Sequence, residues 1–217
     1  MDRDGFRNRL HQGADVLGLQ LPEGTSEALW TFMETLLKWN ARVNLTAITD
    51  PGEVLEKHFL DSLAPLPEVA DATRLLDLGA GAGLPGLPLR LARPELEVTL
   101  VDAVAKKVAF IKQAIAVLGL TPGARAVHMR AAGRPETEGL PRVDVVISRA
   151  LMDFPTWARL GSQYLAEGGR LVAMLGQPLS RSEAEDQAAQ AGLRIVSARE
   201  YRLPFSEASR QVLVAAP

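Results

Sequence analysis

The chain of 217 residues is long enough for one main domain with an extension, and its hydrophobic fraction of 47% is sufficient for a buried core. It has no cysteine, which excludes disulfides, thiolate metal sites and a cysteine nucleophile, and no metal site is predicted. The net charge of −2 argues against nucleic-acid binding through bulk charge, and no apolar run is long enough for a membrane span. A cytoplasmic monomer without membrane association is the expectation.

The first part of the chain predicts helices without intervening strands. Apolar residues recur at helical spacing, and Asp50-Pro51 supplies an N-cap and a first helical position. In the helix that follows, His58 and Asp61 share a face, which favours a buried pair that ties this helix to the domain over a substrate contact. Helices are expected at 4–18, 26–42 and 52–64, so residues 1–70 form an N-terminal helical extension and residues 71–217 the main domain.

From Arg74 onward, strands and helices alternate. Strands are expected at 74–78, 97–101, 124–129, 143–147, 170–175, 193–201 and 210–215, with helices at 85–92, 104–118, 156–166 and 181–191. The last two strands have no helix between them and should pair antiparallel. This order predicts an α/β, Rossmann-like sheet of the class I methyltransferase type with an antiparallel terminal strand, rather than a dehydrogenase sheet.

A glycine-rich turn follows the first strand of this pattern. Gly79, Gly81 and Gly83 stand between that strand and an apolar helix, where the backbone can turn sharply and a ligand can approach the helix start. The acid-x-G-x-G-x-G register, with Asp77 at the strand end, favours S-adenosylmethionine over NAD, because a carboxylate attracts a sulfonium and repels a pyrophosphate. Asp102 ends the next strand, 23 residues after Gly79, where a carboxylate can accept both ribose hydroxyls of either cofactor.

Basic residues gather near the expected site. Residues 103–149 hold eight basic and three acidic side chains, which allows a local surface for nucleic acid. Arg130 and Arg149 fall at strand ends, and Arg149 directly follows an apolar strand, which favours a role in the site over a structural ion pair. Lys106 and Lys107 open a helix, where the dipole disfavours cations, so a phosphate contact and a solvated pair are both open readings.

The chemistry is narrowed by residues that the chain lacks. Methylation of a pyrimidine C5 usually needs a cysteine, and methylation of an exocyclic amine usually uses an (Asn/Asp)-Pro-Pro-(Tyr/Phe) loop. This chain has Ser148-Arg149-Ala150-Leu151 at that place. A ring nitrogen such as guanine N7 has an in-plane lone pair and needs alignment rather than a general base. Arg149 could then hold the guanine O6, as arginine does in DNA grooves.

Several separated motifs resemble the RsmG family, also called GidB. They are WNARVNLTAI at Trp39–Ile48, HFLDSL at His58–Leu63, DLGAGAGLPGLPL at Asp77–Leu89, VDAVAKKVAFI at Val101–Ile111 and SRA at Ser148–Ala150. The resemblance implies an S-adenosylmethionine-dependent methyltransferase that modifies N7 of a guanosine in small-subunit ribosomal RNA, with the RNA or the 30S subunit as its partner. It also implies cofactor contacts at Gly79, Leu84, Ala131, Ala132 and Arg149.

The chain departs from the family pattern at two places. The family usually carries a glutamate where this chain has Ala132, and often a lysine where it has Leu175. Three alternatives therefore stay open at this point: an NAD-dependent oxidoreductase, a non-catalytic RNA- or ribosome-binding module with a degenerate cofactor pocket, and a small-molecule methyltransferase.

Overall fold

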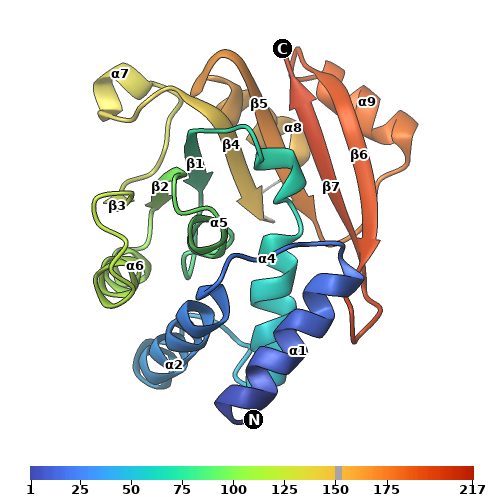
Figure 1. Ribbon diagram of the computed structural model, residues 1–217. Coiled ribbons are helices and arrows are strands. Elements are labelled where there is room, and N and C mark those ends of the chain that lie inside the picture. Colours follow the sequence, from blue (N-terminus) through green and yellow to red (C-terminus); the bar gives the residue numbers. More distant parts are fainter. Residues whose placement is uncertain (150–152) are drawn as a thin grey trace.

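The computed structural model describes residues 1–149 and 153–217. Its strands are β1 (Arg74–Leu78), β2 (Glu97–Asp102), β3 (Ala124–His128), β4 (Val143–Arg149), β5 (Leu165–Leu175), β6 (Arg194–Arg202) and β7 (Ser209–Ala216). They form one sheet in the order β3-β2-β1-β4-β5-β7-β6 (Figure 1). β1 to β5 run parallel, and β7 lies antiparallel between β5 and β6, so the predicted α/β sheet with antiparallel terminal strands is confirmed.

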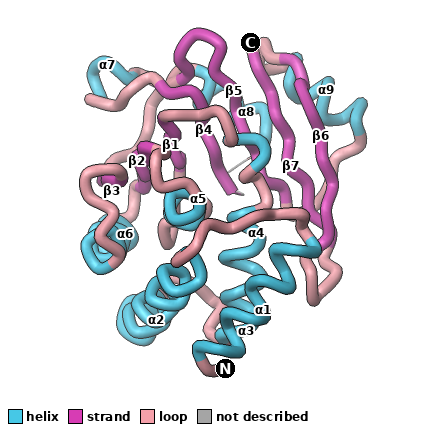
Figure 2. Tube along the Cα trace, viewed as in Figure 1, coloured by secondary structure: helices cyan, strands magenta, loops and turns pink. Residues whose placement is uncertain are grey.

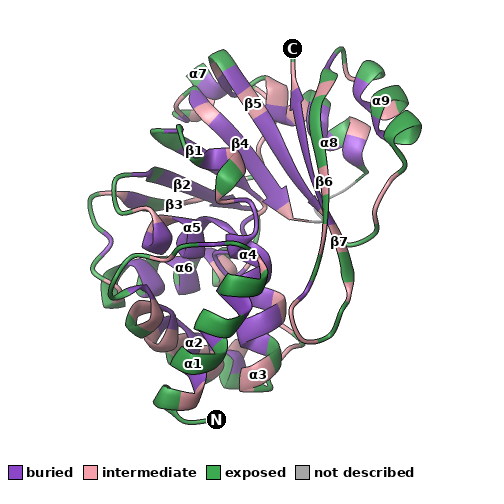
Figure 3. Cartoon of the chain, turned by 45° about the vertical axis from the view of Figure 1, so that its right-hand side comes forward, coloured by how far each residue is buried: buried purple, intermediate pink, exposed green. Residues whose placement is uncertain are grey.

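Helices cover both faces of the sheet. α5 (Gly86–Ala92) and α6 (Ala105–Val117) lie against one face, and α8 (Phe154–Ser162) and α9 (Arg181–Ala189) against the other (Figure 2). In β1, Leu75 packs into the core under α5 and α6, while its neighbour Leu76 packs into the core under α8 and α9. Strands buried on both faces need continuous apolar runs, and the central strands are accordingly buried along most of their length (Figure 3).

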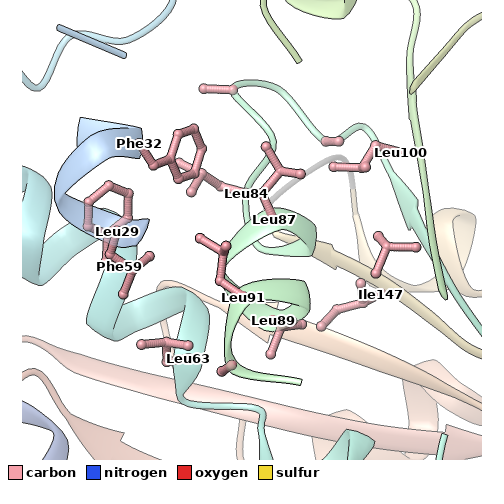
Figure 4. Close-up of a cluster of buried hydrophobic side chains, with 14 of the residues drawn as sticks. Leu29, Phe32, Phe59, Leu63, Leu84, Leu87, Leu89, Leu91, Leu100 and Ile147 are labelled. Atoms are coloured by element: carbon pink, nitrogen blue, oxygen red, sulfur yellow. The ribbon is translucent and has the colours of Figure 1, made fainter. Parts of the chain in front are cut away.

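The N-terminal helices extend the core on the α5 and α6 side. They are α1 (Arg3–Val16), α2 (Thr25–Val43), the continuous helical segment α3 (Pro51–Glu53), η1 (Val54–Leu60) and α4 (Asp61–Leu63), and the short turn η2 (Pro67–Val69). The ring of Phe32 stacks on Phe59 at a centroid distance of 5.4 Å and on Phe110 of α6 at 6.2 Å. Figure 4 shows the α2 and η1 rings close to the leucines of α5. The hydrophobic core is continuous across residues 70 and 71, and the domain boundary expected there stays a prediction.

The expected helix at 156–166 and strand at 170–175 are wrong at their junction. α8 ends at Ser162, and β5 begins at Leu165 and continues through the two glycines expected to form a turn. Tyr164 leaves the helix because its fully buried side chain reaches Glu138. A Cβ at Gly169 would stand 3.0 Å from the Val143 carbonyl oxygen, so glycine is needed there for close approach of two strands.

The other expected elements are confirmed to within two residues at each end. One helix was not expected: α7 (Pro135–Glu138), a single turn that precedes β4. Among the described residues, no helix combines the length and the hydropathy that a membrane span needs.

The start of α5 is packed so closely that it predicts a destabilising substitution. A Cβ at Gly86 would lie 2.9 Å from Asp77 Oδ2 and 3.0 Å from Leu100 Cδ2. We expect Gly86→Ala to lower the free energy of unfolding by about 1–3 kcal/mol in urea denaturation, because the overpacked methyl group must displace its neighbours. The control is Gly176→Ala, where no atom lies within 4 Å of the new methyl group. Equal stability of the two variants would contradict this account of the packing.

Candidate active site

The glycine-rich turn connects β1 to α5 with a backbone that only glycine adopts easily. Gly79, Gly81 and Gly83 have φ values of 77°, 59° and 80°. The N–H groups of Gly79 and Ala80 both donate to the Val101 carbonyl oxygen at the end of β2, at 2.8 and 3.0 Å. These bonds fix the turn against the neighbouring strand, so its position follows from the parallel pairing of β1 with β2.

A cavity of about 550 Å³ lies beside this turn, at the carboxyl ends of β1 to β4. Ligands in open α/β sheets bind at this edge. The predicted site residues that line the cavity are Gly79, Gly81, Leu84, Asp102, Lys107, Arg130, Ala131 and Arg149. The other four, Asp77, Gly83, Ala132 and Lys106, are not among its lining residues. The sheet thus brings most of the predicted site together, and the role of each residue stays a prediction.

Asp102 forms one wall of the cavity and is held by two backbone amides. Its Oδ2 accepts a hydrogen bond from the Gly81 N–H at 2.9 Å, and its Oδ1 accepts one from the Val104 N–H at 2.8 Å. The carboxylate is therefore oriented by the glycine turn on one side and by the approach to α6 on the other. Each oxygen keeps a lone pair for a further donor from the cavity.

Asp77 lies beneath the glycine turn and is fully buried. Its Oδ2 accepts a hydrogen bond from the Gly86 N–H at 2.8 Å, while its Oδ1 has no hydrogen-bond partner in the described part of the chain. Burial raises the pKa of Asp77 to about 7, although the Gly86 bond and the charge of Arg149 oppose this shift. Asp77 is thus a buried acid close to its titration point at neutral pH.

The N-terminal extension enters the cavity through a loop clasped by Asn40. The Asn40 side chain accepts hydrogen bonds from the N–H groups of Leu45 and Thr46 at 2.6 and 2.9 Å, and it donates to the Thr46 carbonyl oxygen at 2.9 Å. Asn44 ends α2 with a φ of 46°. These bonds place Leu45 and Thr46 in the cavity wall. Sequence spacing marked the two asparagines as unusual but did not show that their loop would reach the site.

Arg149 joins the end of β4 to the same extension. Its Nη1 donates to the Lys57 carbonyl oxygen at 2.9 Å and contacts Asp61 Oδ2 at 3.3 Å. Asp61 Oδ1 also accepts a hydrogen bond from the Tyr201 hydroxyl at 2.8 Å. His58 and Asp61 therefore tie their helix to the domain as expected, but through Arg149 and Tyr201 rather than as a mutual pair. The guanidinium is 22% exposed and still faces the cavity.

His58 is neutral in this arrangement. Burial, together with the positive charge of Arg149, lowers the pKa of His58 to about 4. Its Nδ1 faces a guanidinium nitrogen of Arg149 at 3.5 Å, and a guanidinium can only donate, so Nδ1 is the unprotonated nitrogen. Nε2–H then donates to the Thr46 hydroxyl at 2.9 Å. The ring is thereby fixed in one tautomer at the cavity wall.

The loop after β3 is braced by a residue that the motifs did not indicate. Glu138 of α7 accepts hydrogen bonds from the Ala132 N–H at 2.6 Å and from the Tyr164 hydroxyl at 2.6 Å. The Tyr164 oxygen in turn accepts one from the Gly133 N–H at 2.8 Å. Although burial raises the pKa of Glu138, the bonds from Tyr164 and Ala132 lower it below its usual value. A carboxylate therefore holds the loop although position 132 is an alanine.

The basic residues predicted for RNA lie in different settings. Lys106 is exposed, and its Nζ donates to the Val43 carbonyl oxygen at the end of α2, at 2.9 Å. Lys107 is half-buried in the cavity wall, and Arg130 is exposed at its rim. Their contact with RNA stays a prediction. Ala150, the last residue of the SRA motif, and Leu151 lie outside the described residues.

The pKa of Asp77 predicts how stability changes with pH. Because this pKa is higher in the folded chain than in the unfolded one, ionisation of Asp77 destabilises the fold as the pH rises from about 4 to 7. Asp77→Asn cannot ionise. Its free energy of unfolding should therefore gain a few kcal/mol on that of the wild type across this range, measured by urea denaturation at each pH.

Asp144 provides the control with the opposite sign. Although burial raises the pKa of Asp144, hydrogen bonds from Thr73 lower it below the usual value. Asp144→Asn should therefore lose stability relative to the wild type as the pH rises through the acid range. The same pH dependence in both variants would show that burial does not control the ionisation of Asp77.

The Glu138 bonds predict a local loosening. In Glu138→Ala, the Ala132 and Arg134 N–H groups and the Tyr164 hydroxyl lose their acceptor. Hydrogen exchange at these amides should accelerate at least about tenfold, because each lost bond stabilises the loop by about 1 kcal/mol or more. The control is Glu136→Ala on the same helical turn, whose carboxylate pairs with Arg142 instead and should leave the exchange unchanged. Unchanged exchange in Glu138→Ala would show that the loop does not depend on this acid.

Comparison with known proteins places this chain among its relatives. The model of the family described as GidB, rRNA small subunit methyltransferase G, matches residues 25–214. Two relatives named ribosomal RNA small subunit methyltransferase G come from Myxococcus xanthus and Anaeromyxobacter dehalogenans. They are 60% and 49% identical, over 99% and 95% of this chain and 98% and 95% of theirs.

Solved structures share the fold at low sequence identity. A SAM-dependent methyltransferase from Aquifex aeolicus has a TM-score of 0.59 at 19% identity, over 79% of this chain and 96% of its own. SMU.776, a methyltransferase solved with SAH, has a TM-score of 0.58 at 14% identity, over 73% of this chain and 50% of its own. These similarities confirm the expected methyltransferase type of sheet. With the family match over most of its length, the chain belongs to the GidB family of small-subunit rRNA methyltransferases.

Proposed function

We propose that this protein transfers the methyl group of S-adenosylmethionine to N7 of a guanosine in bacterial 16S ribosomal RNA. The observation that carries the proposal is the cavity that joins the glycine turn and Asp102 to Arg149 in a chain of this family. The partner in this proposal is the small-subunit RNA, alone or in the 30S subunit. The protein acts as a monomer in the cytoplasm.

The cavity fits S-adenosylmethionine in size and in its donor set. Its volume is that of a small-molecule site. A Cβ at Gly81 would meet only the Gly79 carbonyl oxygen, at 3.9 Å, so glycine leaves this side of the turn open to a ligand. Asp102 would accept the ribose hydroxyls, the turn from Gly79 to Leu84 would contact the ligand through its backbone, and Ala131 and Ala132 would border the adenine. When bound, S-adenosylmethionine supplies an electrophilic methyl group on a sulfonium.

Asp77 and Gly83 support this site without lining it. Asp77 carries a negative charge under the turn when it ionises, and a cationic ligand above the turn would favour that ionised form. A Cβ at Gly83 would stand 2.6 Å from Leu87 Cδ1, so this glycine is needed for the turn to pack on α5. Both residues therefore act through the shape and the field of the turn.

Arg149 is the residue best placed to orient the base. It stands at the cavity wall with its guanidinium held by Lys57 and Asp61, and it can donate to the O6 of a guanine. N7 carries a free lone pair, so the chain needs no general base for the transfer. The neutral His58 is consistent with that mechanism, because its only free ring nitrogen faces Arg149. Catalysis then comes from alignment of the two reactants.

The alternatives are less well supported. An NAD-dependent oxidoreductase does not fit the antiparallel terminal strands or a buried acid under the turn, where it would repel a pyrophosphate. A degenerate, non-catalytic pocket was suggested by Ala132, but Glu138 supplies a carboxylate to the same loop. A small-molecule methyltransferase would not account for the family match.

The decisive experiment uses 30S subunits that lack the modification. We expect label from S-adenosylmethionine to enter one guanosine of the small-subunit RNA, mapped by chemical cleavage at 7-methylguanosine, and to enter transfer RNA at background level. S-adenosylmethionine, but not NAD, should raise the melting temperature, because only a ligand that binds the folded state stabilises it.

The matched variants are Arg149→Ala and Arg149→Lys. Arg149→Ala should lower the transfer rate by about 100-fold, because a misaligned base loses the proximity advantage. Arg149→Lys should recover only part of the rate, because lysine lacks the planar fork of arginine. Full transfer by Arg149→Ala would remove Arg149 from the mechanism, and stabilisation by NAD without methyl transfer would overturn the proposed function.

A further inference from the structure

A second cavity, of about 260 Å³, lies next to the first and shares two lining residues with it, His58 and Arg149. It stands at the carboxyl end of β5, where β7 begins. Ile48, Met174 and Leu175 give it apolar walls. These walls leave flat, apolar space beside charged groups, which is the combination that a planar heterocycle needs.

The charged groups form one cluster around Asp61. The carboxylate of Asp61 contacts the guanidinium of Arg149 at 3.3 Å, the guanidinium of Arg210 at 3.5 Å and the Tyr201 hydroxyl at 2.8 Å. Its side chain is 6% exposed, and those of the two arginines are 22% and 24% exposed. Two guanidiniums on one carboxylate leave a net positive charge and N–H donors turned toward the cavity.

The donors and the walls together select the ligand. A guanine presents two acceptors, O6 and N7, on one edge, and arginine is the usual partner of that edge. A bare phosphate would gain nothing from the apolar walls. Arg149 stands at the boundary of the two cavities, so a base that accepts from it through O6 has the adjacent N7 directed toward the first cavity.

We propose that the second cavity receives the target guanine after it has left its base stack, and that Asp61 and Tyr201 position the arginines that hold it. The inference rests on the proposed function, because it assigns the methyl acceptor of the same site. Enzymes that act on a base commonly take it out of the stack into a pocket. Arg149 and Arg210 contact the base, and Asp61 and Tyr201 act through them.

The charge of the cluster suits the transfer. The N7 lone pair forms the bond to the methyl carbon as the methyl–sulfur bond breaks, and the electron pair of that bond goes to sulfur. The positive charge therefore passes to the purine, and no proton is released. A pocket with a net positive charge holds the neutral guanine and repels the cationic product, which favours release after transfer.

The first test fills the cavity. Leu175→Trp places a large ring in the apolar wall, far from the glycine turn and Asp102. Calorimetry with S-adenosylmethionine should give the wild-type affinity, while methyl transfer to unmodified 30S subunits should fall by about 100-fold or more. The matched control is Val196→Trp, at a position 52% exposed on the edge strand β6, which should change neither quantity.

A second pair of variants decides the question if Leu175→Trp does not fold. Arg210→Ala should raise KM for 30S subunits by about tenfold with a smaller effect on kcat, because it removes a charged donor to the base. Arg202→Ala removes the same charge from exposed β6, outside the cavity, and should leave KM nearly unchanged. Tyr201→Phe should show the same KM change as Arg210→Ala in a weaker form, without loss of cofactor affinity.

Each outcome has a distinct meaning. Wild-type transfer by Leu175→Trp, or equal effects of Arg210→Ala and Arg202→Ala, would overturn the base pocket and leave the proposed function intact. Loss of S-adenosylmethionine binding in Leu175→Trp would make the second cavity part of the cofactor site and would also overturn it. If the wild-type protein transfers no methyl group to 30S subunits, the proposed function and the base pocket fail together.

Discussion

The guanidinium of Arg149 donates to the Lys57 carbonyl oxygen and contacts the Asp61 carboxylate, so the end of β4 is bonded to a helix about ninety residues earlier in the chain. Both cavities depend on this connection, because Arg149 and His58 stand between them and line both. Without it, the N-terminal helices would contact the sheet only through the apolar core. The same side chain is thus a structural ion pair and the group nearest to the expected chemistry, two readings that the sequence had set against each other.

The N-terminal extension is a working part of the site. Asn40 holds the loop that brings Thr46 to the cavity, and Thr46 fixes the tautomer of His58. The aromatic rings of α2 and η1 pack against α6, so their position is set by the same core that supports the sheet. A substitution in this core, far from the cavity, would therefore shift groups in the cavity wall.

The sequence allowed the sheet and the glycine turn to be predicted because their signals are local. Strand and helix periodicities alternate, and Gly79 to Asp102 carry a fixed spacing. The errors arose where tertiary contacts decide. The end of α8 depends on Tyr164 reaching Glu138, and the two glycines of β5 serve a close approach to β4 that no local pattern reveals. Asp77 was placed by motif as a ligand of the cofactor, whereas its carboxylate is bonded to the Gly86 N–H beneath the turn.

The bond from the Ala132 amide to Glu138 has a consequence for how degenerate relatives are recognised. Compared position by position, this chain has lost an acid. Measured by which carboxylate reaches the loop amide, it has kept one, six residues further along. A methyltransferase judged inactive because a motif residue is missing should therefore be inspected for an acid that has moved along the chain, since evolution conserves the bond rather than the column of an alignment.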